Sequence, residues 1–441
     1  MAVDLAPLND LVEDILDRRG VTPTKLGSEF RDSGHRVISA KLMKDHRLDL
    51  AADEARYVDA PTYRRWMATP IRADDVLLTS EAPLGEVAYL QREVDWCLGQ
   101  RLFCIRTDKR KLHGRYLFYC LRGEPSRTDL LARATGTTVQ GIRQSELRRV
   151  GIPLRPLPEQ KRIAHILGTL DDKIDLNRRM NATLEGISRA IFKSWFVDFD
   201  PVRQKAAGQQ PVGMDAQTAA LFPDSFEDSE IGEVPKGWTV GSILEQASLL
   251  SGGTPKTDEP SYWGGAISWA SAKDVSQCGD SFLAITERTI TDQGVENSAT
   301  KILPAKTTVV VSRGATTGRM AMLANEMAIN QTCYGLHSTI NTPFALYCHT
   351  QSFVDRLVNA AHGSVFDTIT TRTFETMPVL LAPSNLLSAF ESSVTGLFGR
   401  VRCNILQTRT LAALRDTVLP KLLSGEIRVP EAEQAVEEAI A

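Results

Sequence analysis

The chain contains two copies of one sequence unit, and this internal repeat constrains its fold more than any other feature. Thr22-Pro23 recurs as Thr254-Pro255, and Ser39-Ala40-Lys41 recurs as Ser271-Ala272-Lys273, both 232 residues later. Segment 71–80 matches 303–312 at the same offset, and from Gly136, which matches Gly363, the offset settles at 227. A fixed repeat indicates two related structural units. The 441 residues would otherwise suggest about three domains of ~150 residues.

Each copy ends in a stripe of apolar residues spaced three or four apart, which is typical of a helix with one buried face. All eight positions map onto the second copy at an offset of 227. A helix over 163–195 would be ~50 Å long at ~1.5 Å per residue, too long for a small domain to cover, so we expect the two helices to pack on each other. The stripe residues are Ile163, Leu167, Leu170, Ile174, Leu184, Ile187, Ile191 and Trp195, matched by Phe390, Val394, Leu397, Val401, Leu411, Leu414, Val418 and Leu422.

Symmetry predicts the direction of this helix pair. Two copies of one unit tend to associate about a two-fold axis, and an axis perpendicular to the pair makes the helices antiparallel. Asn177 and Asn404 interrupt the two stripes at the same place. Antiparallel packing brings them within about a turn of each other, so we predict that they pair and fix the register; the alternative is that each faces solvent at a gap in the stripe.

The sequence on the N-terminal side of each long helix predicts mixed α/β structure. Short β-rich runs bounded by turn residues are typical of strands, and short helices are expected at Gly114–Leu121 and Phe344–Val358. The expected strands are Val76–Thr79, Leu102–Ile105, Thr308–Val311 and Ala321–Leu323. The predicted organisation is globular regions 1–157 and 236–382, long helices within 158–205 and 383–425, an acidic linker 206–235 and an acidic C-terminal tail 426–441.

The charge of the chain is unevenly distributed. The formal net charge of −3 argues at first against nucleic acid as a partner. Residues 101–155, however, hold 13 Lys and Arg against 4 Asp and Glu, whereas 206–235 hold six acids and no base. The basic excess is therefore local, and either a nucleic-acid contact or a solvated basic face explains it.

The sequence lacks the motifs of catalysis and of metal binding. Gly252-Gly253-Thr254-Pro255-Lys256-Thr257 resembles a phosphate-binding loop, but its glycine spacing fails. The seven histidines are scattered, and the seven cysteines form no zinc-type pairs, so reduced thiols are expected. No stretch approaches 18 apolar residues and the N-terminus has no signal-peptide pattern, so we expect a cytoplasmic protein without a membrane span. A duplicated module without a reaction centre favours recognition over chemistry.

Four segments resemble the specificity (S) subunits of type I restriction–modification systems. Ile152–Ile163, which contains Pro158-Glu159-Gln160, is similar to the proline-rich entry into the first conserved helix of that family. The entry into the second helix, Ala382–Leu387, departs from the pattern because it lacks Pro-Glu-Gln. The other three segments that resemble the family are Phe192–Arg203, Gly232–Trp238 and Leu419–Ile427.

The resemblance implies an α+β fold with two mixed α/β target recognition domains, separated by two antiparallel helices that form a coiled-coil spacer. Each domain is expected to read one half of a bipartite, asymmetric double-stranded DNA site. The resemblance also implies a chain without catalysis or bound cofactor of its own. It would assemble with two methylation subunits, which use S-adenosylmethionine, and with two restriction subunits, which use ATP and Mg²⁺.

Candidate DNA contacts divide into three groups. Positions matched in both copies are expected to serve shared tasks such as phosphate contact or framework, whereas unmatched Arg and Lys beside them suit guanine readout. The alternative for each is a solvated surface charge. The matched residues are Lys41, Ser80 and Gln100 with Lys273, Ser312 and Gln331; the unmatched ones are Lys44, Arg101, Arg313 and Arg319; and a phosphate patch is expected at Arg106, Lys109, Arg110 and Lys111.

Three other functions stay open at this point. The chain could be an enzyme in its own right, although no methyltransferase or nuclease centre is found. It could be a coiled-coil adaptor that binds no DNA, which the basic segment and the repeat disfavour. It could also be the specificity component of a standalone methyltransferase or a type IIB-like system.

Overall fold

The computed structural model describes residues 4–51, 53–360 and 368–440 of the chain. The chain forms two compact units, residues 1–174 with 410–441 and residues 175–409, which we call the first and the second unit. Two long helices, α5 (Leu157–Phe196) and α12 (Ser384–Ser424), contribute one half each to both units. In the described residues, no helix is long and apolar enough to cross a membrane.

The first unit is built on a four-stranded antiparallel sheet with strand order β2-β10-β7-β8. A smaller sheet has the order β6-β3-β9, in which β3 and β9 run parallel. The strands are β1 (Leu5–Pro7), β2 (Val12–Asp17), β3 (His35–Ile38), β4 (Met43–Lys44), β5 (Arg47–Leu48), β6 (Tyr57–Val58), β7 (Val76–Thr79), β8 (Val87–Tyr89), β9 (Cys97–Leu98), β10 (Leu102–Thr107) and β11 (Gly151–Pro153). The shorter helices are α1 (Ala60–Trp66), α2 (Gly114–Arg122), α3 (Ser126–Ala132), α4 (Gln144–Leu147) and α13 (Val429–Ile440).

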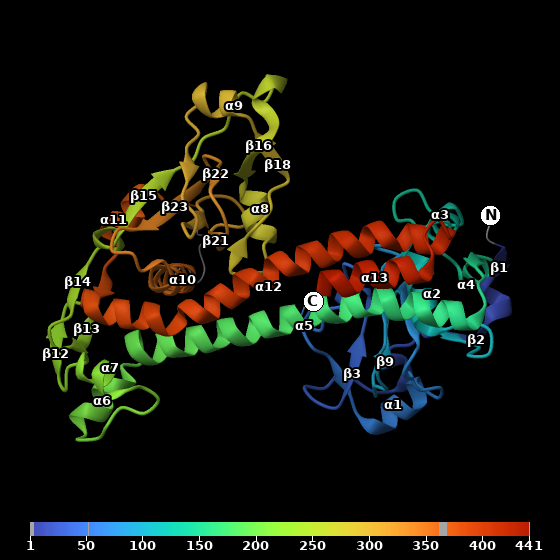
Figure 1. The fold of residues 1–441 in the computed structure, drawn as a ribbon. Coiled ribbons are helices and arrows are strands. Elements are labelled where there is room, and N and C mark those ends of the chain that lie inside the picture. The colour runs from blue at the N-terminus through green and yellow to red at the C-terminus, as the bar shows by residue number, and fades with distance from the viewer. Residues whose placement is uncertain (1–3, 52, 361–367, 441) are drawn as a thin grey trace. The chain divides into compact units, whose positions relative to one another are not determined.

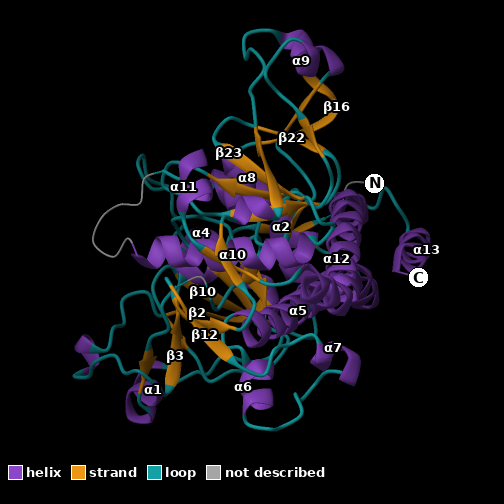
Figure 2. Ribbon diagram, turned by 90° about the vertical axis from the view of Figure 1, so that its left-hand side faces the viewer, coloured by secondary structure: helices purple, strands orange, loops and turns teal. Residues whose placement is uncertain are grey.

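The second unit repeats this plan with a five-stranded sheet, β15-β23-β20-β21-β17, and a four-stranded sheet, β18-β16-β22-β19. Its strands are β12 (Phe226–Ser229), β13 (Gly232–Pro235), β14 (Thr239–Gly241), β15 (Ala247–Ser251), β16 (Trp263–Ala270), β17 (Phe282–Leu283), β18 (Arg288–Ile290), β19 (Ile302–Leu303), β20 (Thr308–Val311), β21 (Met320–Leu323), β22 (Met327–Ile329), β23 (Cys333–Ser338) and β24 (Val379–Leu381). Its shorter helices are α6 (Asp200–Ala206), α7 (Ala216–Ala220), α8 (Ala272–Gln277), α9 (Asp292–Glu296), α10 (Pro343–Ala360) and α11 (Thr371–Thr376). Figure 2 shows strands and helices mixed in this way.

The strand registers confirm the repeat. In the first unit β10 pairs with β7 so that Leu102 faces Thr79, and in the second β23 pairs with β20 so that Cys333 faces Val311. The parallel pair β3·β9 has its counterpart in the parallel pair β16·β22. The four predicted strands and both predicted short helices are present. The mixed α/β fold class with an internal repeat is therefore confirmed.

The long helices are antiparallel, as expected. In the first unit the N-terminal half of α5 shares a core with the C-terminal half of α12, and in the second unit the opposite halves meet. Figure 1 shows α5 and α12 running side by side. One stripe position was predicted wrongly, because Ile187 is 43% exposed while the neighbouring Ser188 is buried. Ser188 can take the buried place because its hydroxyl donates to the carbonyl of Leu184 at 3.0 Å, which leaves no polar group unpaired.

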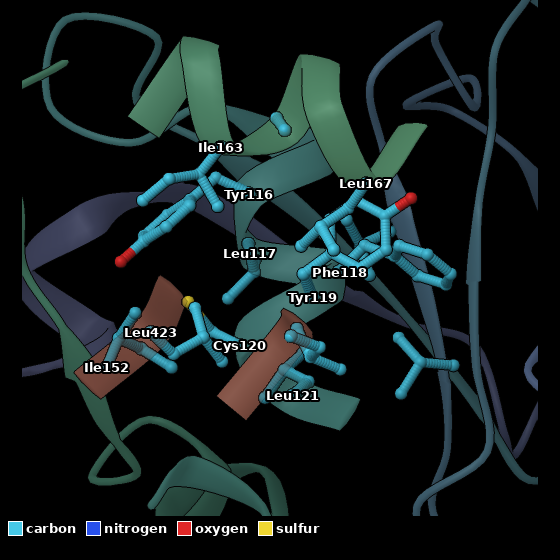
Figure 3. Close-up of a cluster of buried hydrophobic side chains, with 14 of the residues drawn as sticks. Tyr116, Leu117, Phe118, Tyr119, Cys120, Leu121, Ile152, Ile163, Leu167 and Leu423 are labelled. Carbon is cyan, nitrogen blue, oxygen red and sulfur yellow. The ribbon is translucent and has the colours of Figure 1, made fainter. Parts of the chain in front are cut away.

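Helix α2 joins the sheet of the first unit to the helix pair. Nearly all of its side chains are buried, including Tyr116, Leu117 and Tyr119. Figure 3 shows these side chains together with Ile163 and Leu167 of α5 and with Leu423 of α12. The Tyr116 hydroxyl donates to the carbonyl of Pro153 at 2.9 Å, so the ring is buried without an unpaired hydroxyl.

Two segments differ from the sequence-based expectation. The acidic linker 206–235 contains helix α7 and the hairpin β12·β13. The acidic C-terminal tail forms α13, in which Ala432 and Val436 are buried in the core of the first unit. Its Glu433 pairs with Arg162 of α5 at 2.7 Å. Gly363, the expected partner of Gly136 in the repeat, lies outside the described residues.

Candidate nucleic-acid interface

Three loops of the first unit converge at one end of its sheet. They follow β2, follow β3 and precede β10, and they line a cleft of about 480 Å³. An adjoining hollow of about 450 Å³ shares Gln100 and Arg101 with this cleft. The cleft therefore collects the segments that recur in the sequence, namely Thr22-Pro23, Ser39-Ala40-Lys41 and Gln100.

The second unit brings the corresponding loops together. Thr254 donates a hydrogen bond to the side-chain oxygen of Gln331. The loop before it must contain glycine, because a Cβ atom on Gly252 would lie 2.2 Å from the carbonyl oxygen of Asn330. Close backbone approach thus accounts for the paired glycines that resemble a phosphate-binding loop. Ser271 caps helix α8, so Lys273 lies in the first turn of that helix.

Each of the two matched lysines forms an ion pair with an acid of its own unit. Lys41 lies 3.4 Å from Asp53, and Lys273 lies 2.6 Å from Glu287. Hydrogen bonding to Glu287 raises the pKa of Lys273. Both lysine side chains are more than half exposed. Exposed ion pairs contribute little to stability, so both ammonium groups remain available to an incoming anion.

The matched serines were candidate DNA contacts with either a phosphate-contacting or a framework role, and the structure corrects the contact with DNA in favour of the framework role. Ser80 and Ser312 are each only 1% exposed. Ser312 donates to the carbonyl of Thr332 at 2.8 Å, and the carbonyls of both serines accept backbone hydrogen bonds, from Ile142 and Ile369 respectively. They are framework residues that hold the loop after β7 and after β20.

Charged side chains at equivalent places on these two loops have opposite signs. At equivalent places after β7 and β20 stand Glu81 and Arg313, and before β8 and β21 stand Glu86 and Arg319. The backbone is shared, because Thr79 donates to Glu86 O at 2.9 Å and Val311 donates to Arg319 O at 2.8 Å. The two units thus share the backbone structure of these loops but differ in the charge of the side chains on them.

In the first unit, one of these acids pairs with a candidate base-reading residue, and the other contacts the hairpin that carries a second one. Glu81 pairs with Arg101 at 3.2 Å, and Arg101 itself has a left-handed backbone with φ of 63°. Glu86 accepts from the backbone N–H of His46 at 2.8 Å, at the tip of the β4·β5 hairpin that carries the exposed Lys44. Burial lowers the pKa of His46.

Arg106 was predicted to belong to a phosphate patch, and this prediction is wrong. Its side chain is 5% exposed and makes two hydrogen bonds, of 2.9 and 2.7 Å, to the buried Asp75. A third bond of 2.8 Å reaches the carbonyl of Pro70. Strand β10 is buried along its whole length. The guanidinium therefore neutralises a buried carboxylate and is not accessible to DNA.

The other three residues of that patch are exposed but lie elsewhere. Lys109, Arg110 and Lys111 follow the C-terminal end of β10, whereas Gln100 and Arg101 precede its N-terminal end. A six-residue strand separates the two groups by about 20 Å. Arg110 is 88% exposed and, by hydrogen bonding, lowers the pKa of Asp108 to about 2. The basic patch and the cleft are therefore two separate candidate surfaces.

The stripe asparagines are buried between the helices but do not bond to each other. Asn404 donates to Asn181 at 2.9 Å, and Asn177 donates to Gln407 at 2.9 Å and to Thr408 at 3.4 Å. The expected direct pair is thus replaced by bonds to residues one turn away on the opposite helix. Whether these bonds fix the register stays a prediction.

Sequence reasoning missed Arg56 and Arg288. Each guanidinium stacks on an aromatic ring beside the converging loops. The signal was present in the sequence, because the two arginines are 232 residues apart, the offset of the matched segments around them. In the described part of the chain no group of three or more His, Cys, Asp or Glu side chains could hold a metal ion.

Known proteins resemble this chain in sequence and in fold. The family model described as the type I restriction modification DNA specificity domain matches residues 8–186 and 235–385. The chain is 24% identical over 411 residues to the type I restriction enzyme HindI specificity subunit of Haemophilus influenzae, covering 81% of this chain and 87% of the relative. It is 25% identical over 368 residues to the MjaIX specificity subunit of Methanocaldococcus jannaschii, covering 81% and 78%.

One solved structure shares the fold over nearly the whole chain. It is the crystal structure of the S subunit of a type I restriction–modification system from M. genitalium. The TM-score is 0.58 at 15% sequence identity, with 95% of this chain and 96% of that chain covered.

Proposed function

The chain belongs to the family of type I restriction modification DNA specificity domains, and from this premise we propose that it reads a bipartite, asymmetric DNA site and directs a type I restriction–modification complex to it. Each unit would read one half-site. The chain itself would supply recognition and assembly, while its partners supply the chemistry.

One observation carries the proposal: the same three loops converge in both units, but the loops beside them, after β7 and after β20, place different side chains at equivalent positions. The buried Ser80 and Ser312 belong to the framework that the two units share. The residues that follow them, Glu81 and Arg313, occupy equivalent positions but have opposite charges. Phosphates are the same in every sequence, whereas base edges differ, so a common frame with different exposed groups suits two unlike half-sites.

The helix pair supports a spacer between the half-sites. Helices α5 and α12 contain 40 and 41 residues, which corresponds to ~60 Å at ~1.5 Å per residue. In this proposal the pair acts as a ruler that sets how many unread base pairs separate the two half-sites. An antiparallel pair with an internal two-fold also suits a DNA site whose halves are read from opposite directions.

The partners follow from the family and from the chemistry of the chain. We expect two methylation subunits, which bind S-adenosylmethionine, and two restriction and translocation subunits, which bind ATP and Mg²⁺. The cytoplasm, where the DNA of the cell lies, is the expected location. A standalone methyltransferase or a type IIB-like system would use the same recognition chain with a different set of partners.

Two measurements test this proposal. Methylated sites are mapped across the genome of cells that carry the chain together with its methylation subunit. We expect one methylated motif made of two unequal half-sites around a fixed spacer; a continuous motif, or no motif, would contradict the proposal. Methyl transfer by the purified chain alone would instead show an enzyme in its own right, and a folded chain that binds no DNA would support the adaptor.

A further inference from the structure

Arg56 and Arg288 occupy the same place in the two units. In the first unit His35 of β3 faces Val58 of β6, and in the second Ile267 of β16 faces Ile290 of β18. Both partners of each pair are related by an offset of 232. Arg56 immediately precedes β6, and Arg288 is the first residue of β18. Strand register therefore agrees with the sequence offset in making the two arginines equivalent.

In the second unit a pair of tryptophans holds both the arginine and the neighbouring loop. The guanidinium carbon of Arg288 lies 3.3 Å from the ring centroid of Trp263 and 5.9 Å from that of Trp269. The Trp263 indole N–H donates to the carbonyl of Lys256 at 3.0 Å, and that of Trp269 donates to the carbonyl of Gly253 at 2.9 Å. The loop that carries Thr254-Pro255 is thereby fixed relative to Arg288.

The first unit has a simpler version of the same arrangement. The guanidinium carbon of Arg56 lies 5.6 Å from the ring centroid of Phe30. Phe30 is 45% exposed. Both residues line the cleft that also contains Lys41, Gln100 and Arg101.

Both guanidinium groups lie over the face of an aromatic ring. A ring face attracts a cation without using its N–H donors, so these donors stay available for hydrogen bonds to an anion. Among the described residues, no carboxylate lies within ion-pair distance of either arginine. The neighbouring Lys41 and Lys273 each form an exposed ion pair with an acid.

We propose that Arg56 and Arg288 are paired phosphate anchors, one for each half-site, which grip the DNA backbone at equivalent places in the two units. The proposal rests on the DNA-reading function proposed above. Phosphate rather than a base is the target, because the arginine occupies the same place in two units that differ at Glu81 and Arg313, and only the backbone is common to unlike half-sites. Stacking lowers the entropy lost when the DNA binds.

The test measures binding of the full-length chain to a DNA duplex of random sequence between about 50 and 200 mM salt. We expect Arg56→Ala and Arg288→Ala each to weaken binding roughly fivefold to tenfold and to lower the salt slope by about one. Arg56→Lys and Arg288→Lys keep the charge but lose the planar, bidentate guanidinium, so they should recover the slope and only part of the affinity. Phe30→Leu should weaken binding although it changes no charge.

Arg149→Ala is the matched control, since Arg149 is also an exposed arginine of the first unit, paired with Glu146 at 3.3 Å. It should leave affinity and slope unchanged. Thermal unfolding of each variant confirms that it is folded. A changed methylation motif with unchanged random-sequence binding would overturn the proposal in favour of base readout, and so would full affinity in both alanine variants. If the unaltered chain binds no DNA, the proposed function fails, which is a distinguishable result.

Discussion

Asn404 of α12 donates a hydrogen bond of 2.9 Å to Asn181 of α5, and this bond is the repeat-related counterpart of the bond from Asn177 to Thr408. Asn404 is Asn177 shifted by 227 residues, and Thr408 is likewise Asn181 shifted by 227. The two bonds therefore lie symmetrically about one point in the helix pair. The internal two-fold of the sequence is present in the hydrogen bonds of the structure.

These buried amides are expected to specify the alignment of the helices. Replacing both Asn177 and Asn404 with Leu removes the donors and leaves the side-chain oxygens of Gln407 and Asn181 without partners, so the pair should shift register or change its oligomeric state. Cysteine cross-links between α5 and α12 report the register, and sedimentation reports the oligomer. Two leucines at the exposed Thr183 and Ser393 serve as the control. An unchanged cross-linking pattern in the double Leu variant would refute the register role.

Asp171 of α5 ties the first globular region to both long helices. Its carboxylate accepts from Tyr119 at 2.7 Å, from Arg122 at 3.1 Å and from Arg415 at 2.7 Å. Burial alone would raise the pKa of Asp171, but the two arginines and the hydroxyl lower it below its ordinary value. The stabilisation is therefore complete above about pH 4 and is lost as pH falls through the lowered pKa.

Asp171→Asn should leave two largely buried arginines short of a counter-charge. We expect the free energy of unfolding of the first unit to fall by about 3 to 5 kcal/mol. The adjacent Asp172→Asn is a close control, because Asp172 also pairs with an arginine, Arg115, but is 47% exposed, and it should cost less than about 1 kcal/mol. Denaturant unfolding measures both. Equal losses in the two variants would contradict the role of the buried network.

His349 of α10 should make the second unit sensitive to mild acid. Burial, with the positive charge of Arg356, lowers the pKa of His349 to about 4. A histidine with a lowered pKa is protonated more readily when unfolded, so stability is highest above about pH 6.5 and falls progressively down to about pH 4. The limit is about 1.4 kcal/mol per pH unit; His349 remains partly accessible, so we expect about 1 kcal/mol between pH 6.5 and 5. His349→Gln should flatten this part of the pH profile, and an unaltered slope would exclude His349 as its source.

The basic patch of Lys109, Arg110 and Lys111 gives a separate prediction. If it contacts phosphates, changing all three to Ala weakens binding to every DNA sequence and lowers the salt slope. The methylation motif should stay the same, because no base reader is changed. Salt-dependent binding of random duplex measures this, and an unchanged slope would leave the patch as a solvated face at the far end of β10.

Hydrophobic periodicity was enough to predict the long helices and most of the central strands. A helix with one buried face has apolar residues three or four apart, and a fully buried strand is a short run of apolar residues. It failed where only a few apolar residues attach a segment to the core. Helix α13 buries Val429, Ala432 and Val436 within an acid-rich segment, and its composition alone suggested a tail.

The residues of the candidate site, too, could be predicted only in part from the sequence. Arg106 and Arg110 belong to one basic run, yet Arg106 lies in a fully buried strand opposite Asp75 and Arg110 is 88% exposed. Sequence cannot separate them without knowing which strand neighbours supply a carboxylate. The stacked Arg56 and Arg288 escaped notice because their aromatic partners, Phe30 and Trp263, are brought close by strand pairing and not by sequence.

Exchange of one recognition region tests the central claim most directly. Residues 1–157 are replaced by the corresponding region of a relative with a different methylation motif, and the motif is mapped again in cells with the methylation subunit. We predict that one half-site changes while the other half-site and the spacer stay the same. A change in both half-sites, or in neither, would contradict the account of two independent readers on one helix pair.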